Sequence, residues 1–400
     1  MKSKMNSEEK RKLNLGDHIK LKIGSIAHGG HFISRYNGQV IFVRHAITDE
    51  IAIVKITSIN SKIAFGDAIK ILEVSEDRVS SPCKYALPEY CGGCDFQHIS
   101  IKEQKKYKKL VIQDQFKRIA NIDIDVEFFD IAPRSGLNWR TRFDFAISKN
   151  GKIGLFSSGS KKIIEIDKCL IAVNEINKSK IFKRKWKGLD RLKISSSNTN
   201  QTNIYRSGKN ISGPTILREK VNENNYDISP GSFWQSHRNA PEILIKKVLE
   251  FANFKLDECV CDLYGGVGLF TLPILNKIGP MGKIHLIENN IRCIKDARKI
   301  FKDRKNIVLH NGKVEQKLKD IYEIDVIVLD PPRNGVSKKV INQIIEKMPR
   351  SIIYISCNPA SLARDTKILL EKFYFLDKII GLDLFPMTHH IECITSFIKK

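Results

Sequence analysis

Three side chains near the C-terminus of this 400-residue chain occupy positions where chemistry is expected. Cys357 and Asp330 each end an apolar run, in SIIYISCNP and DVIVLDPP. Such runs are typical of buried parallel strands, and ligands of parallel α/β sheets bind outside the carboxyl ends of the strands. Glu392 lies in HHIECITSF, where the flanking Ile391 and Cys393 indicate a packed face. We therefore expect the thiol and the two carboxyl groups to meet in one pocket.

A thiol and a carboxylate in one pocket fit a specific problem in pyrimidine chemistry. Carbon 5 of uracil is a poor nucleophile, but addition of a thiolate to carbon 6 gives an enolate whose carbon 5 attacks a sulfonium methyl group. A base must then remove the carbon 5 proton so that the thiolate can leave. Cys357 is the predicted nucleophile and Glu392 the predicted base. The thiol must be partly ionised, and we expect a basic neighbour such as Arg333 or Arg364 to favour that.

A glycine-rich turn, DLYGGVGLFTLP (262–273), precedes these runs and indicates a nucleotide cofactor. It follows an apolar run and leads into a predicted helix, and its glycines let the backbone turn sharply and approach a ligand. Glu288 ends the next predicted strand about 20 residues further on, where an acidic side chain hydrogen-bonds ribose hydroxyls. The turn lacks the full G-x-G-x-x-G spacing, so the pattern favours S-adenosylmethionine over NAD.

A second group of cysteines predicts a metal centre. Cys83, Cys91 and Cys94 have the spacing C-x7-C-x2-C, and thiolates at such spacing bind zinc or an iron–sulfur cluster. Cys169 is the candidate fourth ligand. The spacing alone leaves zinc and iron–sulfur open.

The charge of the chain predicts a polyanionic partner. There are 68 Lys and Arg against 44 Asp and Glu, a net charge of +24. Neutralising phosphates releases condensed counterions, so this excess favours nucleic acid. No apolar run reaches the roughly 20 residues of a membrane span, and the charged N-terminus lacks the hydrophobic stretch of a secretory signal. We expect a cytoplasmic monomer without membrane contact.

The pattern of apolar residues divides the chain into four segments. Residues 1–13 are predicted to be a disordered arm. Residues 14–79 alternate with a period of two between tight turns, which is typical of a small β-barrel. Residues 80–234 are expected to form a β-rich domain that includes the cysteines. Residues 235–400 alternate between helix and buried strand, which predicts an α/β domain with a parallel, doubly wound sheet.

One helix is predicted inside the β-rich segment, over IKEQKKYKKLVIQDQFKRIA (101–120). It is strongly basic and amphipathic. The residues expected near its apolar face are Leu110, Val111, Gln115, Phe116 and Ile119.

SCNP, DPPR, HIE and GGC-x-x-QH together resemble the RNA 5-methyluridine methyltransferase family, in the iron–sulfur branch typified by enzymes of 23S ribosomal RNA. The resemblance covers nearly the whole chain. Residues 27–50 are similar to the TRAM domain, an RNA-binding β-barrel. The resemblance implies a class I, Rossmann-like methyltransferase domain. It also implies S-adenosylmethionine-dependent methylation of uridine carbon 5, with ribosomal RNA as the expected substrate.

The resemblance also implies roles for individual residues. Cys357 matches the nucleophile and Glu392 the base. The implied ligands of a [4Fe-4S] cluster are Cys83, Cys91, Cys94 and Cys169. The implied cofactor contacts are Gln235, Tyr264, Glu288 and Asp330, with the contact near Lys313 left open. Phe233 is placed beside the target base, and Arg140 and Arg142 are candidates for RNA contact.

Three other functions compete with this interpretation. Some relatives with a cluster act on tRNA, so the same reaction on the tRNA T-loop stays open. An adenine amino-methyltransferase is disfavoured, because those enzymes usually carry an aromatic residue after the two prolines, where this chain has Arg333. A non-catalytic RNA-binding or ribosome-assembly factor would use the charge and the barrel equally well. It would not need Cys357 and Glu392 together.

Overall fold

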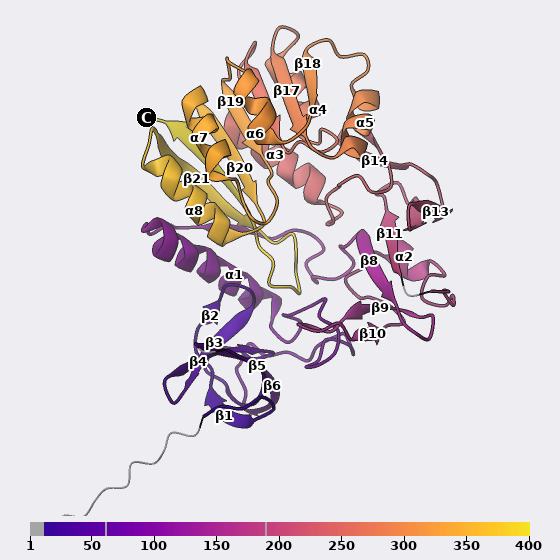
Figure 1. Ribbon diagram of the computed structural model, residues 1–400, viewed down its shortest axis with the longest axis vertical. Helices are drawn as coiled ribbons and strands as arrows, with labels where there is room; N and C mark the ends of the chain where they lie inside the picture. The colour runs from indigo at the N-terminus through magenta and orange to yellow at the C-terminus, as the bar shows by residue number, and fades with distance from the viewer. Residues whose placement is uncertain (1–11, 61, 189) are drawn as a thin grey trace, which may run out of the picture.

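The computed structural model describes residues 12–60, 62–188 and 190–400 (Figure 1). Of the predicted arm, residues 1–11 lie outside the described part. A small β-domain, a central sheet and an α/β domain follow one another along the chain. No helix in the described ranges is long and apolar enough to cross a membrane.

The N-terminal domain is a six-stranded sheet in the spatial order β1-β5-β6-β4-β3-β2. Its strands are β1 (His18–Lys22), β2 (Ile26–Ala27), β3 (His31–Tyr36), β4 (Gln39–Arg44), β5 (Ile51–Ile59) and β6 (Ile63–Glu73). Neighbouring strands are antiparallel except for β4 and β6. Alternate side chains such as Ile41, Val43 and Val54 are fully buried. The predicted alternation with a period of two is therefore confirmed.

The central sheet has the spatial order β10-β9-β8-β11-β12-β13. Its strands are β8 (Arg142–Ile147), β9 (Ile153–Phe156), β10 (Ile163–Glu165), β11 (Arg191–Ser196), β12 (Thr202–Arg206) and β13 (Lys209–Ser212), with α2 (Asn174–Lys178) between β10 and β11. Trp139, Phe145 and Ile194 lie in a core that also includes Cys169.

The α/β domain is built on an eight-stranded sheet. In spatial order its strands are β18 (Ile307–Asn311), β17 (Lys283–Glu288), β16 (Cys259–Leu263), β19 (Val326–Leu329), β20 (Ser351–Ser356), β22 (Glu392–Lys399), β21 (Tyr374–Leu382) and β7 (Glu127–Phe129). The first five are parallel, as predicted, whereas β22 runs antiparallel to both of its neighbours.

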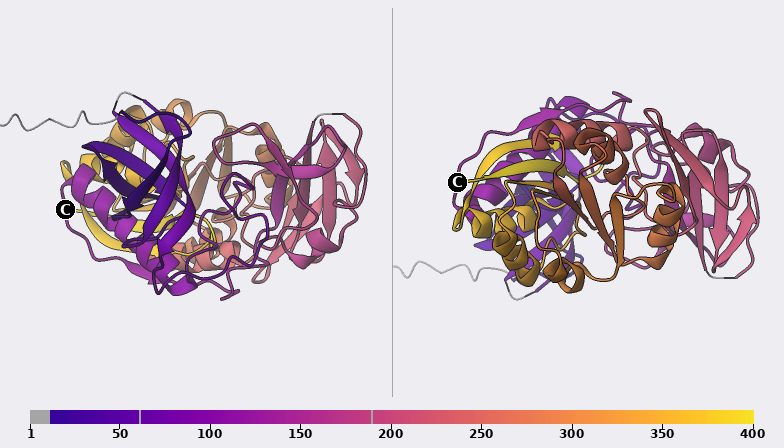
Figure 2. Two further views of the ribbon diagram at one scale, coloured as in Figure 1. Left: turned by 90° about the horizontal axis from the view of Figure 1, so that it is seen from below. Right: turned by 90° about the horizontal axis from the view of Figure 1, so that it is seen from above.

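Helices cover both faces of this sheet, as Figure 2 shows. The helices of one core are α3 (Ala240–Ala252), α4 (Thr271–Ile278) and α5 (Ile291–Ile300). Those of the other are α1 (Ile101–Gln115), α6 (Val314–Lys317), α7 (Lys338–Lys347) and α8 (Pro359–Leu370). Two short helices, η1 (Phe116–Ala120) and η2 (Leu318–Asp320), extend α1 and α6. The predicted doubly wound α/β class is confirmed.

Two pieces of the predicted β-rich segment 80–234 pack with the α/β domain instead. Strand β7 pairs with β21 and so closes one edge of the large sheet. The hairpin of β14 (Leu217–Val221) and β15 (Asn224–Ile228) contributes Tyr226 to the α/β core, where its hydroxyl donates to the Leu269 carbonyl at 3.1 Å. Strand pairing and burial place β7 and the hairpin with the α/β domain. Neither can be predicted from the composition of the segment.

The predicted helix 101–120 is confirmed, but its buried face is rotated. Val111 and Phe116 are buried, whereas Leu110 is 44% exposed. Gln104 and Lys108 are buried in its place, because each hydrogen-bonds the C-terminal segment of the chain.

Candidate active site

Three loops meet at the carboxyl edge of the large sheet. Asp330 follows β19 and Cys357 follows β20. Strand β22 is antiparallel, so its first residue, Glu392, lies at the edge where β20 ends: Cys393 pairs with Ser356. The structure therefore brings together the three side chains expected to share a pocket.

Burial dominates the electrostatics of the nucleophile. It raises the pKa of Cys357 to about 11, with further contributions from the Glu392 and Asp330 carboxyl groups, and Arg333 acts in the opposite direction. Arg364 was expected to help, but its guanidinium pairs with Asp365 at 2.7 Å and is not among the groups that shift the thiol. Arg333 lowers the pKa of Cys357 but does not overcome burial.

The carboxyl groups beside the thiol are also kept from ionising. Burial, and then the charge of Asp330, raise the pKa of Glu392 well above its usual value. Burial and the neighbouring Asp262 raise the pKa of Asp330, which accepts a hydrogen bond from Gln235 Nε2 at 3.2 Å. Like charges in a low-dielectric site cannot all be present together. Burial in this pocket therefore favours neutral carboxyl groups.

A histidine holds Arg333 at the mouth of this site. The Arg333 guanidinium donates to His390 Nε2 at 3.3 Å. Burial, and then the nearby His389 and Arg333, lower the pKa of His390 to about 3, so its imidazole is neutral and can accept. His389 in turn contacts Asp95, with 2.6 Å between Nδ1 and Oδ2.

A cleft next to Asp330 has the features of a cofactor site. Its lining combines aromatic and apolar side chains with the glycine-rich turn: Phe233, Trp234, Gln235, Tyr264, Gly265, Gly266, Val267, Leu269, Phe270 and Asp330. Gly266 has φ 58°, a conformation that favours glycine, and a Cβ there would meet nothing within 4 Å. Glu288 accepts the Gly266 N–H at 3.1 Å and so stands at the turn, as predicted. Phe233, 59% exposed, lies at the edge of the cleft.

The buried carboxyl of Asp330 and the acceptor at Glu288 suit a ligand with a positive charge and a ribose. Three of the residues predicted to contact the cofactor line the cleft, and Glu288 braces its turn. Lys313 begins α6 just beyond Gly312, whose N–H donates to the Glu288 carbonyl at 3.0 Å. It therefore lies at the same edge of the sheet.

Helix α1 anchors the loop that leads to Glu392, a role that the sequence did not reveal. Lys108 Nζ lies 2.8 Å from Asp383 Oδ1 and 2.9 Å from the Phe385 carbonyl. Gln104 Oε1 accepts the Met387 N–H at 2.9 Å. Only 1% of the Lys108 side chain is exposed. A lysine and a glutamine four residues apart on a packed helix face are the one local signal of this contact.

The four predicted metal ligands, Cys83, Cys91, Cys94 and Cys169, line one pocket in the central region. All nine cysteines of the chain carry free thiols. Burial raises the pKa of three of the four, that of Cys169 to about 11. Within the described residues, no three His, Cys, Asp or Glu side chains are placed to hold a single metal ion.

Arg140 and Arg142, the candidates for RNA contact, both lie at partly buried positions. Only 16% of the Arg142 side chain is exposed, and its guanidinium faces Glu219 at 3.9 Å. Arg140 lines the cysteine pocket, with its guanidinium 4.6 Å from the centre of the Phe143 ring. Arg142 begins β8, and the preceding residue Thr141 contacts the α/β domain, where its N–H donates to the Ser236 carbonyl.

A doubly wound sheet with a glycine-rich turn, joined to a small β-domain in a strongly basic chain, defines the class of a nucleotide-cofactor enzyme with a polyanionic partner. Comparisons with known proteins agree. The family model described as tRNA (uracil-5-)-methyltransferase matches residues 214–400, and the TRAM domain model matches residues 12–69.

Whole-length relatives carry the same description. A protein of Streptomyces avermitilis, described as an RNA methyltransferase, is 33% identical over 95% of this chain and 98% of its own length. One from Caldanaerobacter subterraneus, described likewise, is 30% identical over 96% and 98%. The crystal structure of the Pyrococcus abyssi tRNA (uracil-54, C5)-methyltransferase with S-adenosyl-L-homocysteine has a similar fold, with a TM-score of 0.73 at 20% identity over 95% of this chain and all of that one. The chain belongs to the family of S-adenosylmethionine-dependent RNA uracil-5-methyltransferases.

Proposed function

We propose that the protein methylates carbon 5 of a uridine in RNA through a transient bond between Cys357 Sγ and carbon 6 of the base. The observation that carries this proposal is the meeting of Cys357, Glu392 and Asp330 at one edge of the sheet. A protein that only binds RNA has no use for a thiol flanked by two buried carboxyl groups, since burying them costs stability.

In this mechanism, the Cys357 thiolate adds to carbon 6, and carbon 5 of the resulting enolate forms a bond to the methyl group of a sulfonium donor as the bond between that methyl group and the donor sulfur breaks, which would leave a neutral thioether. Glu392 then takes the carbon 5 proton, and the bond between carbon 6 and sulfur breaks. S-adenosylmethionine supplies an electrophilic methyl group and is held by Gln235, Tyr264, Glu288 and Asp330.

The other residues of the site prepare these steps. Arg333, held by His390, favours the thiolate by charge. Glu392 must lose its own proton before it can act as a base, because burial and Asp330 keep it neutral at rest. Phe233 is exposed beside the cleft and is placed to stack on the target base.

A mechanism-based trap tests the covalent step. Carbon 5 of 5-fluorouridine carries no removable proton, so RNA with this base and S-adenosylmethionine should leave a protein–RNA adduct that resists denaturation. The adduct should be absent for Cys357→Ser. Failure of the wild-type protein to form an adduct on any cellular RNA would favour the non-catalytic binder.

We further propose that Cys83, Cys91, Cys94 and Cys169 hold a [4Fe-4S] cluster. A cluster binds each thiolate through a different iron atom and so accepts ligands spaced more widely than those of one zinc ion. This suits four thiols that line a common pocket without forming a site for a single metal ion among the described residues. Protein purified without oxygen should be brown and contain iron and sulfide. A colourless protein with stoichiometric zinc would contradict the assignment.

We propose ribosomal RNA, methylated in the cytoplasm, as the substrate, because the cysteine motif resembles that of the family branch typified by enzymes of 23S ribosomal RNA. The description of the matching family model keeps tRNA as the second candidate. Mass mapping of 5-methyluridine in both RNAs from a deletion strain distinguishes the two.

A further inference from the structure

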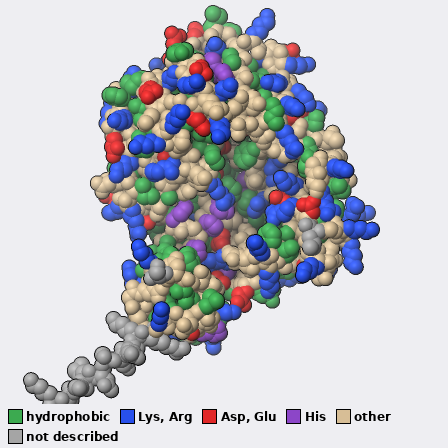
Figure 3. Space-filling view, in the orientation of Figure 1, with side chains coloured by type: hydrophobic (Ala, Val, Ile, Leu, Met, Phe, Trp, Pro, Cys, Tyr) green, Lys and Arg blue, Asp and Glu red, His purple; other side chains and the backbone are tan. Residues whose placement is uncertain are grey.

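A dense group of cations lies on the central domain, away from the site described above. Six of the ten residues from 178 to 187 are basic. All six are exposed: Lys178, Lys180, Lys183, Arg184, Lys185 and Lys187. Figure 3 shows Lys and Arg side chains over the whole visible surface, with a dense group at the right-hand edge. We call residues 178–187 the basic turn.

No acidic side chain neutralises the basic turn. None of its six cations forms an ion pair within the described part of the chain. The nearest acidic residues in sequence are engaged elsewhere: Glu175 pairs with Arg238 at 3.3 Å, and Asp190 with Arg206 at 3.5 Å. A solvated face of mixed charge would show the opposite arrangement. The basic turn therefore presents an uncompensated positive field.

The backbone under these cations is fixed by a buried tryptophan. Trp186 donates from its indole N–H to the Ile181 carbonyl at 3.0 Å, and its backbone N–H donates to the Gly151 carbonyl at 2.8 Å. Both Trp186 and Ile181 are buried. The Arg184 guanidinium lies 4.5 Å from the centre of the Trp186 ring. The backbone that carries the charges is thus fixed before a ligand arrives, which lowers the entropy that binding would cost.

The chemistry of the basic turn fits phosphates better than bases. Proteins that hold single-stranded RNA stack its bases on exposed aromatic rings. In the described residues 174–188, both aromatic side chains pack against the central core, Trp186 within it and Phe182 at its margin. Lysines without exposed rings match the backbone of an RNA helix, which proteins recognise by shape and phosphate contacts.

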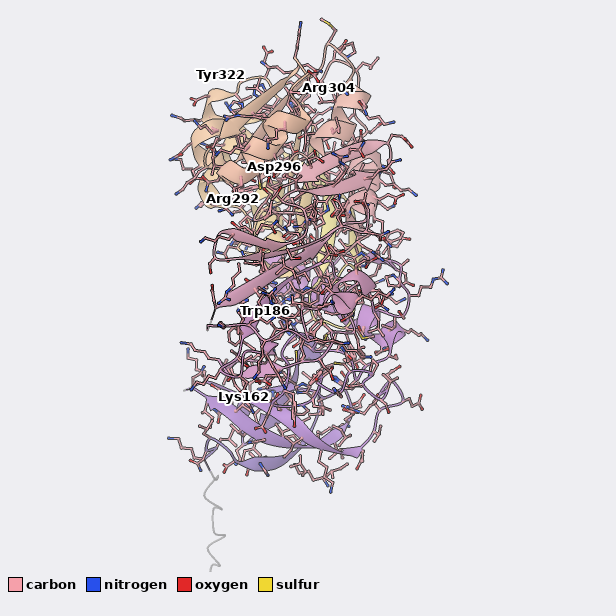
Figure 4. All side chains as sticks on the ribbon, turned by 90° about the vertical axis from the view of Figure 1, so that its right-hand side faces the viewer. Lys162, Trp186, Arg292, Asp296, Arg304 and Tyr322 are labelled. Carbon is pink, nitrogen blue, oxygen red and sulfur yellow. The ribbon has the colours of Figure 1, made fainter. Side chains whose placement is uncertain are left out.

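The basic turn lies at the far end of β8 from the catalytic domain. At the near end, Thr141 N–H donates to the Ser236 carbonyl, next to the cofactor cleft. At the far end, Ile147 N–H donates to the carbonyl of Asp190, just beyond the basic turn. Six strand residues span about 20 Å. In Figure 4, Trp186 is accordingly well separated from Arg292 and Asp296 of α5.

We propose that the basic turn binds the phosphate backbone of an RNA helix that flanks the target nucleotide, about 20 Å from the cofactor cleft along β8. This inference rests on the proposed function for the RNA, and it adds a substrate requirement. The preferred substrate is a structured RNA that continues past the target uridine as a duplex.

Binding to an RNA duplex of about 20 base pairs, longer than the ~16 base pairs spanned by double-stranded RNA-binding domains, tests the inference. Fluorescence anisotropy between about 50 and 200 mM salt gives the slope of log affinity against log salt. The test protein carries Lys180→Gln, Lys183→Gln and Lys185→Gln. Its slope should be smaller in magnitude than that of the wild type by about 2 to 3, since each lost phosphate contact removes about 0.9.

A matched control separates a local contact from net charge. Lys246, Lys339 and Lys372 are exposed, scattered over the α/β domain, and without an ion pair in the described ranges. Changing these three to Gln removes the same charge and should leave the slope unchanged. Equal slopes for the two triple variants would overturn the proposal. So would an equal loss of affinity for a single strand of the same length.

Cys357→Ser distinguishes this inference from the proposed chemistry. It should bind the duplex with the wild-type slope while forming no covalent adduct. The triple variant of the basic turn should still form the adduct on saturating 5-fluorouridine RNA. If the wild-type protein forms no adduct, the proposed reaction is wrong, but the measurement of duplex binding still tests the basic turn.

Discussion

The protein buries thiols in two places, and the two sites differ in what surrounds the sulfur. In both, burial raises the pKa of a cysteine to about 11: Cys357 at the sheet edge and Cys169 in the four-cysteine pocket. Cys357 has an arginine and two carboxyl groups beside it, next to a cleft. Cys169 shares one pocket with three other cysteines and Arg140, whose charge lowers the pKa of the thiol but does not overcome burial, and no carboxyl group lines that pocket among the described residues. A buried thiol is inert until a positive charge favours its ionised form. We infer that Cys357 meets this need transiently during catalysis, and that the four cysteines meet it permanently with a metal centre.

Glu392→Gln tests the catalytic site of this comparison and should have the largest effect on the reaction rate. Glutamine keeps the size of the side chain but cannot accept the carbon 5 proton, so release of the thiolate should slow by about 10² to 10⁴. Denaturing electrophoresis with ordinary uridine RNA should show a methylated adduct that the wild type does not accumulate. Normal turnover without retained adduct would remove Glu392 from the mechanism.

Cys169→Ser tests the four-cysteine pocket. The variant should lose iron and sulfide and unfold at a lower temperature, because metal binding contributes to folding free energy. Cys357→Ser, the matched control, should keep the metal content and the melting temperature of the wild type. If both variants keep their iron, Cys169 is not a ligand.

Lys108→Met tests whether α1 positions the loop that carries Glu392. It leaves the buried Asp383 carboxylate unpaired, which should cost about 3 to 5 kcal/mol of stability. Adding Asp383→Asn should recover much of that stability while the loop still lacks its anchor. We expect the double variant to retain more methylated adduct on ordinary RNA than the wild type. Recovered stability of the double variant with unchanged adduct release would make Lys108 a purely structural residue.

The pH dependence of the reaction sharpens the comparison further. Cys357 and Glu392 both have raised pKa values and must both be ionised to act. The single-turnover rate should therefore increase as the pH rises from 7 to 9, by at most about tenfold per unit for each group. Arg333→Gln should move the profile further to alkaline pH, since it removes the cation that favours the thiolate. A rate that falls over this range would contradict the assignment of both groups.

The sequence predicted the parts of the site that lie at the ends of buried strands. Cys357 and Asp330 follow apolar runs, so their meeting at one edge follows from the parallel sheet itself. Their electrostatics could not be predicted in the same way. Whether Arg364 reaches the thiol depends on the orientation of its guanidinium. In the structure the guanidinium pairs with Asp365.

Long-range contacts account for most of the remaining differences. Lys108 and Asp383 are far apart in the chain, and only the packing of α1 shows that they pair. The three-residue strand β7 becomes recognisable only through its pairing with β21. Arginine is a residue type that often contacts RNA. The guanidinium of Arg142, however, faces Glu219, and only 16% of its side chain is exposed.

Mass spectrometry of the protein after reaction with 5-fluorouridine RNA and S-adenosylmethionine tests the central claim most directly. The account predicts a methylated fluorouridine nucleotide attached to the peptide that contains Cys357, and none after Cys357→Ser. Attachment to another residue, or methylation by Cys357→Ser at the wild-type rate, would contradict it.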